Sequence, residues 1–215
     1  MLLHVPKTGG TTLRNTLGMG QWFKRHHAIG NPRMTEVVQR AGDNAHVFTF
    51  ARDPLDRAVS AYYFFKNSRE NTDKPPKGFS HIKQKAWLFS VVAHAAQMDA
   101  NQFYRGLHAN GRLQLRRMHK VEPHFIPLHY WIKKAEGMGQ PIHYYNFHDF
   151  ANEYHRLLDD LGAQRRPPLK HMMKSRRPRW KDELEPDVIE LLKDWLAEDY
   201  KILDAAGIEV ESASL

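Results

Sequence analysis

The chain has 215 residues and a formal net charge of +8, from 32 Lys and Arg against 24 Asp and Glu. Hydrophobic residues make up 41% of it, which is enough for a folded core and excludes a disordered or low-complexity chain. Cysteine is absent, which excludes disulfides, a thiolate nucleophile, Cys-bound zinc and iron–sulfur clusters. The length predicts one domain over residues 1–215.

The surplus of positive charge and the 14 His residues predict an anionic partner, such as nucleic acid, a membrane surface, an acidic polysaccharide or a phosphorylated cofactor. The longest mostly apolar run, residues 87–96, is far shorter than the ~20 residues that a membrane span needs. Residues 1–6 lack the basic start and the long apolar stretch of a signal peptide. We therefore expect a cytoplasmic protein with no membrane span.

The first predicted element is a short strand at residues 2–5, followed by a glycine-rich turn and a helix. Such a turn directs successive backbone N–H groups and the positive end of the helix dipole to one point, which suits a phosphate or a sulfate. Lys7 adds a charge, and hydroxyl donors come from Thr8, Thr11 and Thr12. Because Lys7 precedes the glycines, the turn is not the ATP-binding loop GxxxxGK followed by Ser or Thr.

A second strand, turn and helix follow. Residues 45–51 form a strand-like run, and Asp53 and Pro54 supply an N-cap and a first helical residue. Arg52 leaves the end of this strand, and Ser60 lies about two turns into the helix, so both can converge on one phosphate. Two such units near the start of the chain favour a parallel sheet with helices packed on it.

Further predicted segments follow, of which four lie beyond residue 140. A brief strand covers residues 142–145, and the next helix has an inward stripe that includes Leu161 and ends at Gly162. Residues 165–181 hold eight Lys and Arg. A single amphipathic helix is predicted from about 186 to 206.

Two of these segments resemble the signatures of one enzyme family. His4 to Thr12, HVPKTGGTT, resembles the 5′-phosphosulfate-binding loop of sulfotransferases that use 3′-phosphoadenosine 5′-phosphosulfate (PAPS). Residues 50–63, FARDPLDRAVSAYY, resemble the 3′-phosphate-binding strand and helix of the same family, in its carbohydrate and heparan-sulfate branch with bacterial members. The resemblance extends from residue 3 to about 207. It implies a three-layer α/β/α fold with a central parallel sheet, of the P-loop nucleotide-kinase type, about four or five strands wide.

The resemblance also implies roles for individual residues. Lys7 stabilises the departing nucleotide, and the loop that binds the phosphosulfate comprises Lys7, Thr8, Gly9, Gly10, Thr11 and Thr12. Arg52 and Ser60 anchor the 3′-phosphate. From its position about one turn before Ser60, Arg57 is expected to join them, to pair with Asp53, or to make another surface contact. Lys174 and Ser175 match the segment that closes over the nucleotide. The basic segment 165–181 is then a lid, in which outer charges such as Arg177 are expected to have no specific role.

The catalytic base belongs to the segment after the first helix, where this chain has Phe23 to Gly30, FKRHHAIG. The resemblance favours His27, with His26 as the alternative, and a histidine side chain titrates near neutral pH as a base requires. Glu36 is the carboxylate alternative. His124 resembles a residue near the acceptor cleft, but Leu128 stands where the family has Gln, so His124 either contacts the acceptor or packs in the core.

The predicted activity is transfer of a sulfuryl group from PAPS to a hydroxyl, or less readily an amine, of a carbohydrate or small metabolite, without a metal. Adenosine 3′,5′-bisphosphate is the nucleotide product. Two other classes stay open: a nucleotide-dependent kinase with an atypical loop, which requires magnesium-dependent ATP binding, and a nucleic-acid-binding module that uses the basic segment. A nucleic-acid-binding module would leave the two N-terminal loops unexplained. A kinase would be expected to have its loop lysine after the glycines, whereas Lys7 precedes them.

Overall fold

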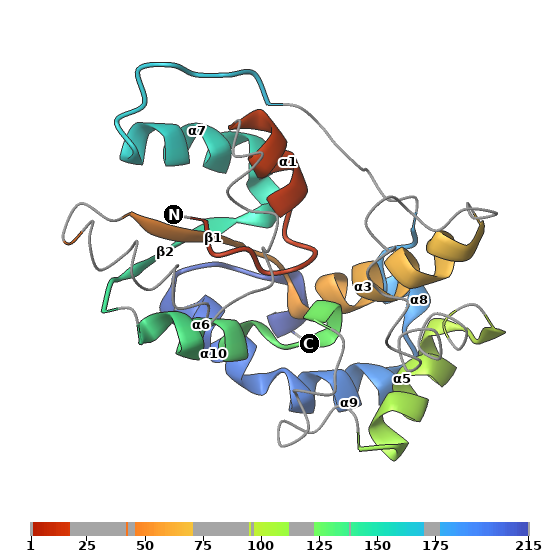
Figure 1. The fold of residues 1–215 in the computed structure, drawn as a ribbon. Coiled ribbons are helices and arrows are strands. Elements are labelled where there is room, and N and C mark those ends of the chain that lie inside the picture. The colour runs from red at the N-terminus through yellow and green to blue at the C-terminus, as the bar shows by residue number, and fades with distance from the viewer. Residues whose placement is uncertain are drawn as a thin grey trace, which may run out of the picture. The chain divides into compact units, whose positions relative to one another are not determined.

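The computed structural model describes most of the chain: residues 2–17, 42, 46–70, 95, 97–111, 123–137, 139–169 and 177–214 (Figure 1). It divides into two compact units. The first comprises Met1–Pro54, Ile126–Lys174 and Ala197–Leu215, and the second comprises Leu55–Phe125 and Ser175–Leu196. The expectation of one domain over 1–215 stays a prediction, and each unit is described by itself.

The first unit contains a small parallel sheet. Strand β1, Val47–Ala51, pairs in parallel with β2, Ile142–Asn146, with Val47 opposite Ile142 and Ala51 opposite Asn146. On the other side of β1, Leu2 forms a parallel bridge to Phe48. All five residues of β1 are buried, as expected for a strand with neighbours on both sides. The predicted parallel arrangement is therefore confirmed, at a smaller size within the described residues.

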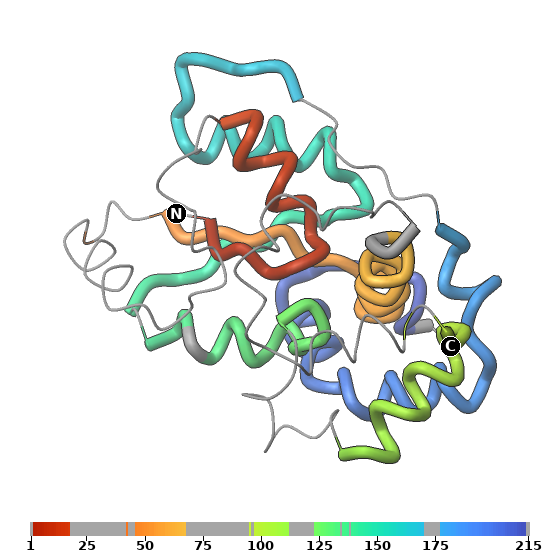
Figure 2. The backbone as a smooth tube through the Cα atoms, turned by 45° about the vertical axis from the view of Figure 1, so that its right-hand side comes forward, coloured from red at the N-terminus to blue at the C-terminus, as the bar shows by residue number. Residues whose placement is uncertain are grey.

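Helices lie on both sides of these strands. In Figures 1 and 2, α1 (Gly10–Thr16) and α7 (Phe150–Asp160) lie on one side, and α6 (Leu128–Glu136) and α10 (Ala197–Ala205) lie on the other. A buried cluster joins α1 and α7 to the strands; it contains Leu2, Leu13, Phe48, Phe50, Tyr145, Tyr154, Leu157 and Leu158. The class is thus mixed helix and strand with a parallel sheet. No described helix is both long and apolar enough to cross a membrane.

The end of α7 follows the predicted glycine cap but not the predicted stripe. Gly162 has a φ of 58°, and its N–H donates to the Asp159 carbonyl while the N–H of Ala163 donates to that of Leu158. These two bonds form a Schellman motif, in which glycine accepts the left-handed conformation. Leu161 was expected inward, yet it is 39% exposed. It is the C-cap residue, where the chain leaves the helix before the turn at Gly162.

The second unit is helical. Helix α3, Pro54–Glu70, begins at its proline as predicted and continues from the first unit into the second; α5 is Ala100–Ala109, α8 is Trp180–Glu183 and α9 is Pro186–Trp195. The hydroxyl of the buried Tyr104 donates to the Ala58 carbonyl at 2.7 Å, which ties α5 to α3. Asn101 donates to the Glu183 carbonyl and accepts from the Glu185 N–H, which ties α5 to the α8–α9 connection.

The single helix predicted over 186–206 is wrong, because the chain breaks at Leu196 between α9 and α10. The two halves bury side chains in different units, Leu192 in the second and Leu203 in the first. Asp199 holds α10 in its place, since its carboxylate accepts from the N–H groups of Leu128 and His129 at the start of α6. The amphipathic pattern continues through both helices, but α9 packs in the core of the second unit and α10 in the core of the first.

A titratable cluster lies along the paired strands, where His46 precedes β1 and both His143 and Tyr145 belong to β2. The buried Tyr145 hydroxyl donates to Asp160 at 2.6 Å and lies 3.0 Å from Nε2 of His46, whose ring stacks on that of His143 at 3.9 Å. Burial lowers the pKa of His46 below its usual 6.5, and the charge of His143 lowers it further. Neutral His46 is thus favoured in the folded state.

We expect the free energy of unfolding to fall as the pH is lowered below 6.5, the ordinary pKa of the His46 side chain. A histidine whose pKa is lower in the folded state than in the unfolded state contributes stability at pH values above its unfolded-state pKa. This contribution is lost as the pH falls through its folded-state pKa. Urea unfolding on both sides of pH 6.5 measures the loss. His46→Gln should reduce the pH dependence, and an unchanged dependence in that variant would assign it to other groups.

Candidate functional site

The predicted anion-binding loop lies near the start of the chain in the first unit, directly before α1. Lys7 has a φ of 69° and Gly9 a φ of 78°, so the backbone turns sharply twice before α1 begins at Gly10. The hydroxyl of Thr8, which is 3% exposed, donates to the Val5 carbonyl at 2.8 Å. Thr8 therefore fixes the turn from within, and a positive φ at a lysine shows that the surroundings hold this conformation.

Both glycines of the loop are required by close packing. A Cβ on Gly9 would lie 2.4 Å from Cε2 of Phe150, and one on Gly10 would lie 1.9 Å from Cδ2 of His4. Gly9 also has the left-handed backbone that disfavours other residues. The glycines thus let the loop lie directly against the ring at the start of α7 and against its own preceding histidine.

Gly10→Ala is expected to lower the free energy of unfolding by about 1–3 kcal/mol, because the new methyl group overlaps the His4 ring. The added His4→Ala change should remove the overlap, so the double variant is destabilised by less than the sum of the single changes. Gly9→Ala is the matched control: its strain comes from φ and from Phe150, so His4→Ala should not relieve it. Urea unfolding measures the three single variants and the two double variants; additive effects at Gly10 and His4 would contradict the assignment.

Arg52 joins the two predicted motifs. It follows β1 and is 7% exposed. Its Nη1 donates to the Lys7 carbonyl at 2.7 Å, and its guanidinium carbon lies 4.4 Å from the centre of the Phe147 ring. A guanidinium can donate in this way and stack on an aromatic face at the same time. Two segments 45 positions apart in the chain are thereby fixed to each other around a buried cation.

The carboxyl ends of β1 and β2 lie together with this loop. The N–H of Asp53 points to Nε2 of His148 at 3.4 Å, and the N–H of His148 donates to the Asn146 side chain at 2.9 Å. His148 belongs to η5, Phe147–Asp149, which directly follows β2. In parallel α/β sheets, ligands bind beyond the carboxyl ends of the strands, which is where these residues and the loop converge.

Two residues of this region make contacts that the sequence did not predict. Asp53 was expected as a helix cap and as an alternative partner of Arg57; its buried carboxylate accepts from the N–H of Ser212 at 2.9 Å. Phe147 was not predicted as part of the site; its ring contacts the Arg52 guanidinium and lies near Gly9. No local pattern indicates either contact, because the partners are distant in the chain.

The other predicted cofactor residues are placed as follows. Thr12 is buried on α1 and Thr11 half-buried beside it, both in the first unit. Ser60 is 2% exposed on α3 in the second unit. Its convergence with Arg52 on one phosphate stays a prediction. His26, His27, Lys174 and Ser175, together with the alternative base Glu36, lie outside the described residues.

His124 packs in the second unit. It belongs to η4, Pro123–Phe125, and its ring stacks on Phe64 with centroids 4.6 Å apart and meets Phe65 edge-on. Its carbonyl accepts from Nη1 of Arg57 at 3.4 Å, and Arg57 is buried and not at the surface. The ring is only half-buried, so the packing that the sequence suggested leaves part of it accessible.

The expectation of no specific role for Arg177 is wrong. Its guanidinium forms an ion pair with Asp56 on α3 at 2.5 Å, and both side chains are nearly buried, at 11% and 12% exposed. A buried pair of this kind is costly to break, because the remaining charge is left without its partner. Arg177 therefore anchors one end of the basic segment 165–181 within the second unit.

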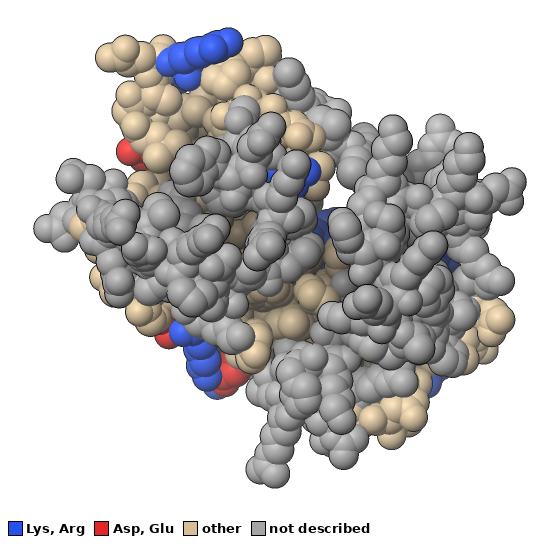
Figure 3. Space-filling view, in the orientation of Figure 1, with Lys and Arg blue, Asp and Glu red and all other residues tan. Residues whose placement is uncertain are grey.

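On the face drawn in Figure 3, some of the described Lys and Arg side chains lie beside Asp or Glu side chains. Several exposed ones are paired with carboxylates: Arg105 with Glu185 and Asp187, Arg156 with Glu153, and Lys201 with Glu198. Such exposed pairs contribute little stability, typically about 0–1 kcal/mol. Their charges are balanced locally and so contribute little to a field that would attract an anion.

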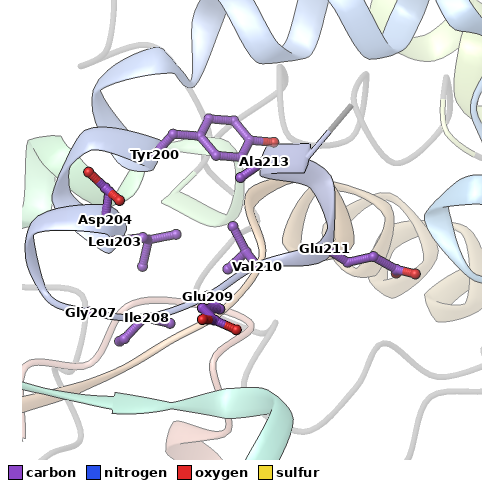
Figure 4. A pocket seen from close by; sticks show the side chains of 9 residues that line it. All are labelled: Tyr200, Leu203, Asp204, Gly207, Ile208, Glu209, Val210, Glu211 and Ala213. Atoms are coloured by element: carbon purple, nitrogen blue, oxygen red, sulfur yellow. The ribbon is translucent and has the colours of Figure 1, made fainter.

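The pocket in Figure 4, of about 780 Å³, lies elsewhere in the first unit. It is lined by α10 and residues 207–213, with Asp204, Glu209 and Glu211 on its wall. None of the described residues predicted to bind the cofactor lines it. Its acidic side chains do not suit an anionic ligand, so the loop, and not this pocket, is the candidate site. Within the described residues, no group of three His, Asp or Glu side chains is placed to hold a metal.

Comparison with known proteins agrees with this geometry. The family model described as "Sulfotransferase family" matches residues 1–204. No curated protein and no solved structure matches the chain significantly. The matched region contains the loop, both strands and Arg52. The chain belongs to the sulfotransferase family.

Proposed function

We propose that the protein transfers the sulfuryl group of PAPS to a hydroxyl, or less readily an amine, of a carbohydrate or small-metabolite acceptor. The family match supports sulfuryl transfer, and the chemistry of the loop supports an anionic donor. Lys7 lies on the turn, Thr11 and Thr12 lie on the first turn of α1, and Arg52 lies next to the loop at the end of β1. Cations and hydroxyl groups so placed suit phosphate and sulfate oxygens. With this activity we also propose the three-layer nucleotide-kinase-type fold, with the described strands as part of its sheet.

One observation carries the proposal: the guanidinium of Arg52 donates to the Lys7 carbonyl. The two signatures that resembled the two ends of a PAPS site are thus in direct contact in the folded chain. Arg52 is nearly buried there, and a buried cation beside a turn is a strong site for a phosphate. A purely structural turn would not need a buried guanidinium, because neutral groups can satisfy a carbonyl.

The proposed reaction is a single in-line displacement. The acceptor oxygen forms a bond to sulfur while the bond from sulfur to the bridging phosphate oxygen breaks, and adenosine 3′,5′-bisphosphate leaves with that electron pair. His27, or alternatively His26, takes the acceptor proton. Lys7 stabilises the charge that develops on the bridging oxygen, and Arg52 with Ser60 holds the 3′-phosphate. Lys174 and Ser175 close over the nucleotide.

Calorimetric titration tests the donor. The protein should bind adenosine 3′,5′-bisphosphate at least tenfold more tightly than AMP, because the 3′-phosphate adds charge-assisted hydrogen bonds. Equal affinity for the two nucleotides would refute the proposal. Magnesium-dependent binding of ATP would favour the kinase, and salt-sensitive binding of DNA or RNA without nucleotide preference would favour the nucleic-acid module. A screen of acceptors with labelled PAPS then identifies the acceptor class.

A further inference from the structure

Asp53 is a buried acidic residue directly beside the proposed nucleotide-binding arginine. Its exposed fraction is 0%, and it follows Arg52 at the carboxyl end of β1. One carboxylate oxygen, Oδ2, accepts from the backbone N–H of Ser212, also 0% exposed, at 2.9 Å. A carboxylate out of water needs such donors, since burying it without them costs several kcal/mol.

The segment that supplies this N–H is itself well fixed. Ser212 lies in η6, Glu211–Ser214, where the Ala213 N–H donates to the Val210 carbonyl at 3.1 Å. The Ser212 hydroxyl and the Tyr200 hydroxyl are hydrogen-bonded at 2.7 Å, which ties η6 to α10. Figure 4 shows Tyr200 on α10 beside Ala213 of η6. The donor is thus presented from a rigid turn and not from a loose chain end.

We propose that Ser212 is a positioning residue of the nucleotide site. Its N–H fixes the Asp53 carboxylate, which in turn fixes the backbone from which Arg52 reaches the Lys7 carbonyl. Ser212 lies beyond residue 204, where the family match ends, so this support is a feature of this chain outside the matched region. The inference rests on the proposed function only for the identity of the ligand; the physical link from Ser212 to the loop does not depend on it.

The test compares Ser212→Pro with Ser212→Ala. Both variants lack the hydroxyl, but alanine keeps the N–H that Asp53 accepts and proline has none. Hydrogen exchange measured by mass spectrometry, without nucleotide, should show faster exchange in peptides that contain Asp53 and the Lys7 loop in Ser212→Pro only. Titration should show that Ser212→Pro loses at least tenfold of the preference for adenosine 3′,5′-bisphosphate over AMP, while Ser212→Ala keeps it.

The outcomes separate the two proposals. Two results would overturn the positioning role: faster exchange in Ser212→Pro that is confined to residues 206–214, or a nucleotide preference in Ser212→Pro equal to that of a wild type that has one. A residue that only stabilises the fold would change the melting temperature and leave the loop and the nucleotide preference as they are. A wild type without nucleotide preference refutes the proposed function, while the exchange result still decides the link. If Ser212→Pro does not fold, saturating bisphosphate should slow exchange of 206–214 in the wild type by reciprocal coupling, and no slowing overturns the role.

Discussion

Arg52→Ala is expected to weaken the binding of adenosine 3′,5′-bisphosphate at least 100-fold and to lower the free energy of unfolding by about 2–4 kcal/mol. The loss of stability comes from the hydrogen bond to the Lys7 carbonyl and from the contact with the Phe147 ring. The loss of affinity is larger because the same guanidinium is the proposed ligand of the 3′-phosphate. Calorimetric titration and urea unfolding measure the two effects.

Two controls sharpen this expectation. Arg52→Lys keeps the charge but not the planar fork, so it should recover part of the stability and little of the affinity. Lys201→Ala removes an exposed cation of the same unit that pairs with Glu198, and it should change neither quantity measurably. If Arg52→Ala loses stability but binds the bisphosphate as the wild type does, then Arg52 supports the loop without contacting the nucleotide.

The sequence predicted the site best where local chemistry decides the structure. The turn that contains Lys7 and Gly9 was recognisable because a glycine-rich run between a strand and a helix has few alternatives. Pro54 begins α3 as predicted, since proline is favoured in the first helical turn. The strand predicted at 142–145 is β2, which extends one residue further, and the strand-like run at 45–51 contains β1.

The rest depends on contacts between distant segments, which no local pattern encodes. Ser212 meets Asp53 across 159 positions, and Arg177 meets Asp56 across 121. The break at Leu196 has the same origin: the period of apolar residues continues through it, and only the division into two units shows that its halves serve different cores. Sequence patterns therefore predicted which residues form the loop, whereas the packing decided what supports it.

His27→Ala is expected to lower kcat about 100- to 10,000-fold while leaving the affinity for adenosine 3′,5′-bisphosphate unchanged. The proposed base takes a proton from the acceptor and does not hold the nucleotide, so its loss should affect turnover alone. His26→Ala is the matched control, since the two residues are neighbours of the same type and only one of them can be in register with the acceptor.

A rate assay with labelled PAPS at saturating acceptor, together with the nucleotide titration, separates the effects on kcat from those on binding. The wild-type pH profile of kcat should rise through the ordinary histidine range, near pH ~6.5, and this limb should vanish in the variant that lacks the base. The larger loss in His26→Ala would move the assignment to that residue. Equal and mild losses in both variants would place the base elsewhere and make Glu36 the next residue to replace, because a carboxylate can perform the same proton transfer when its pKa is raised.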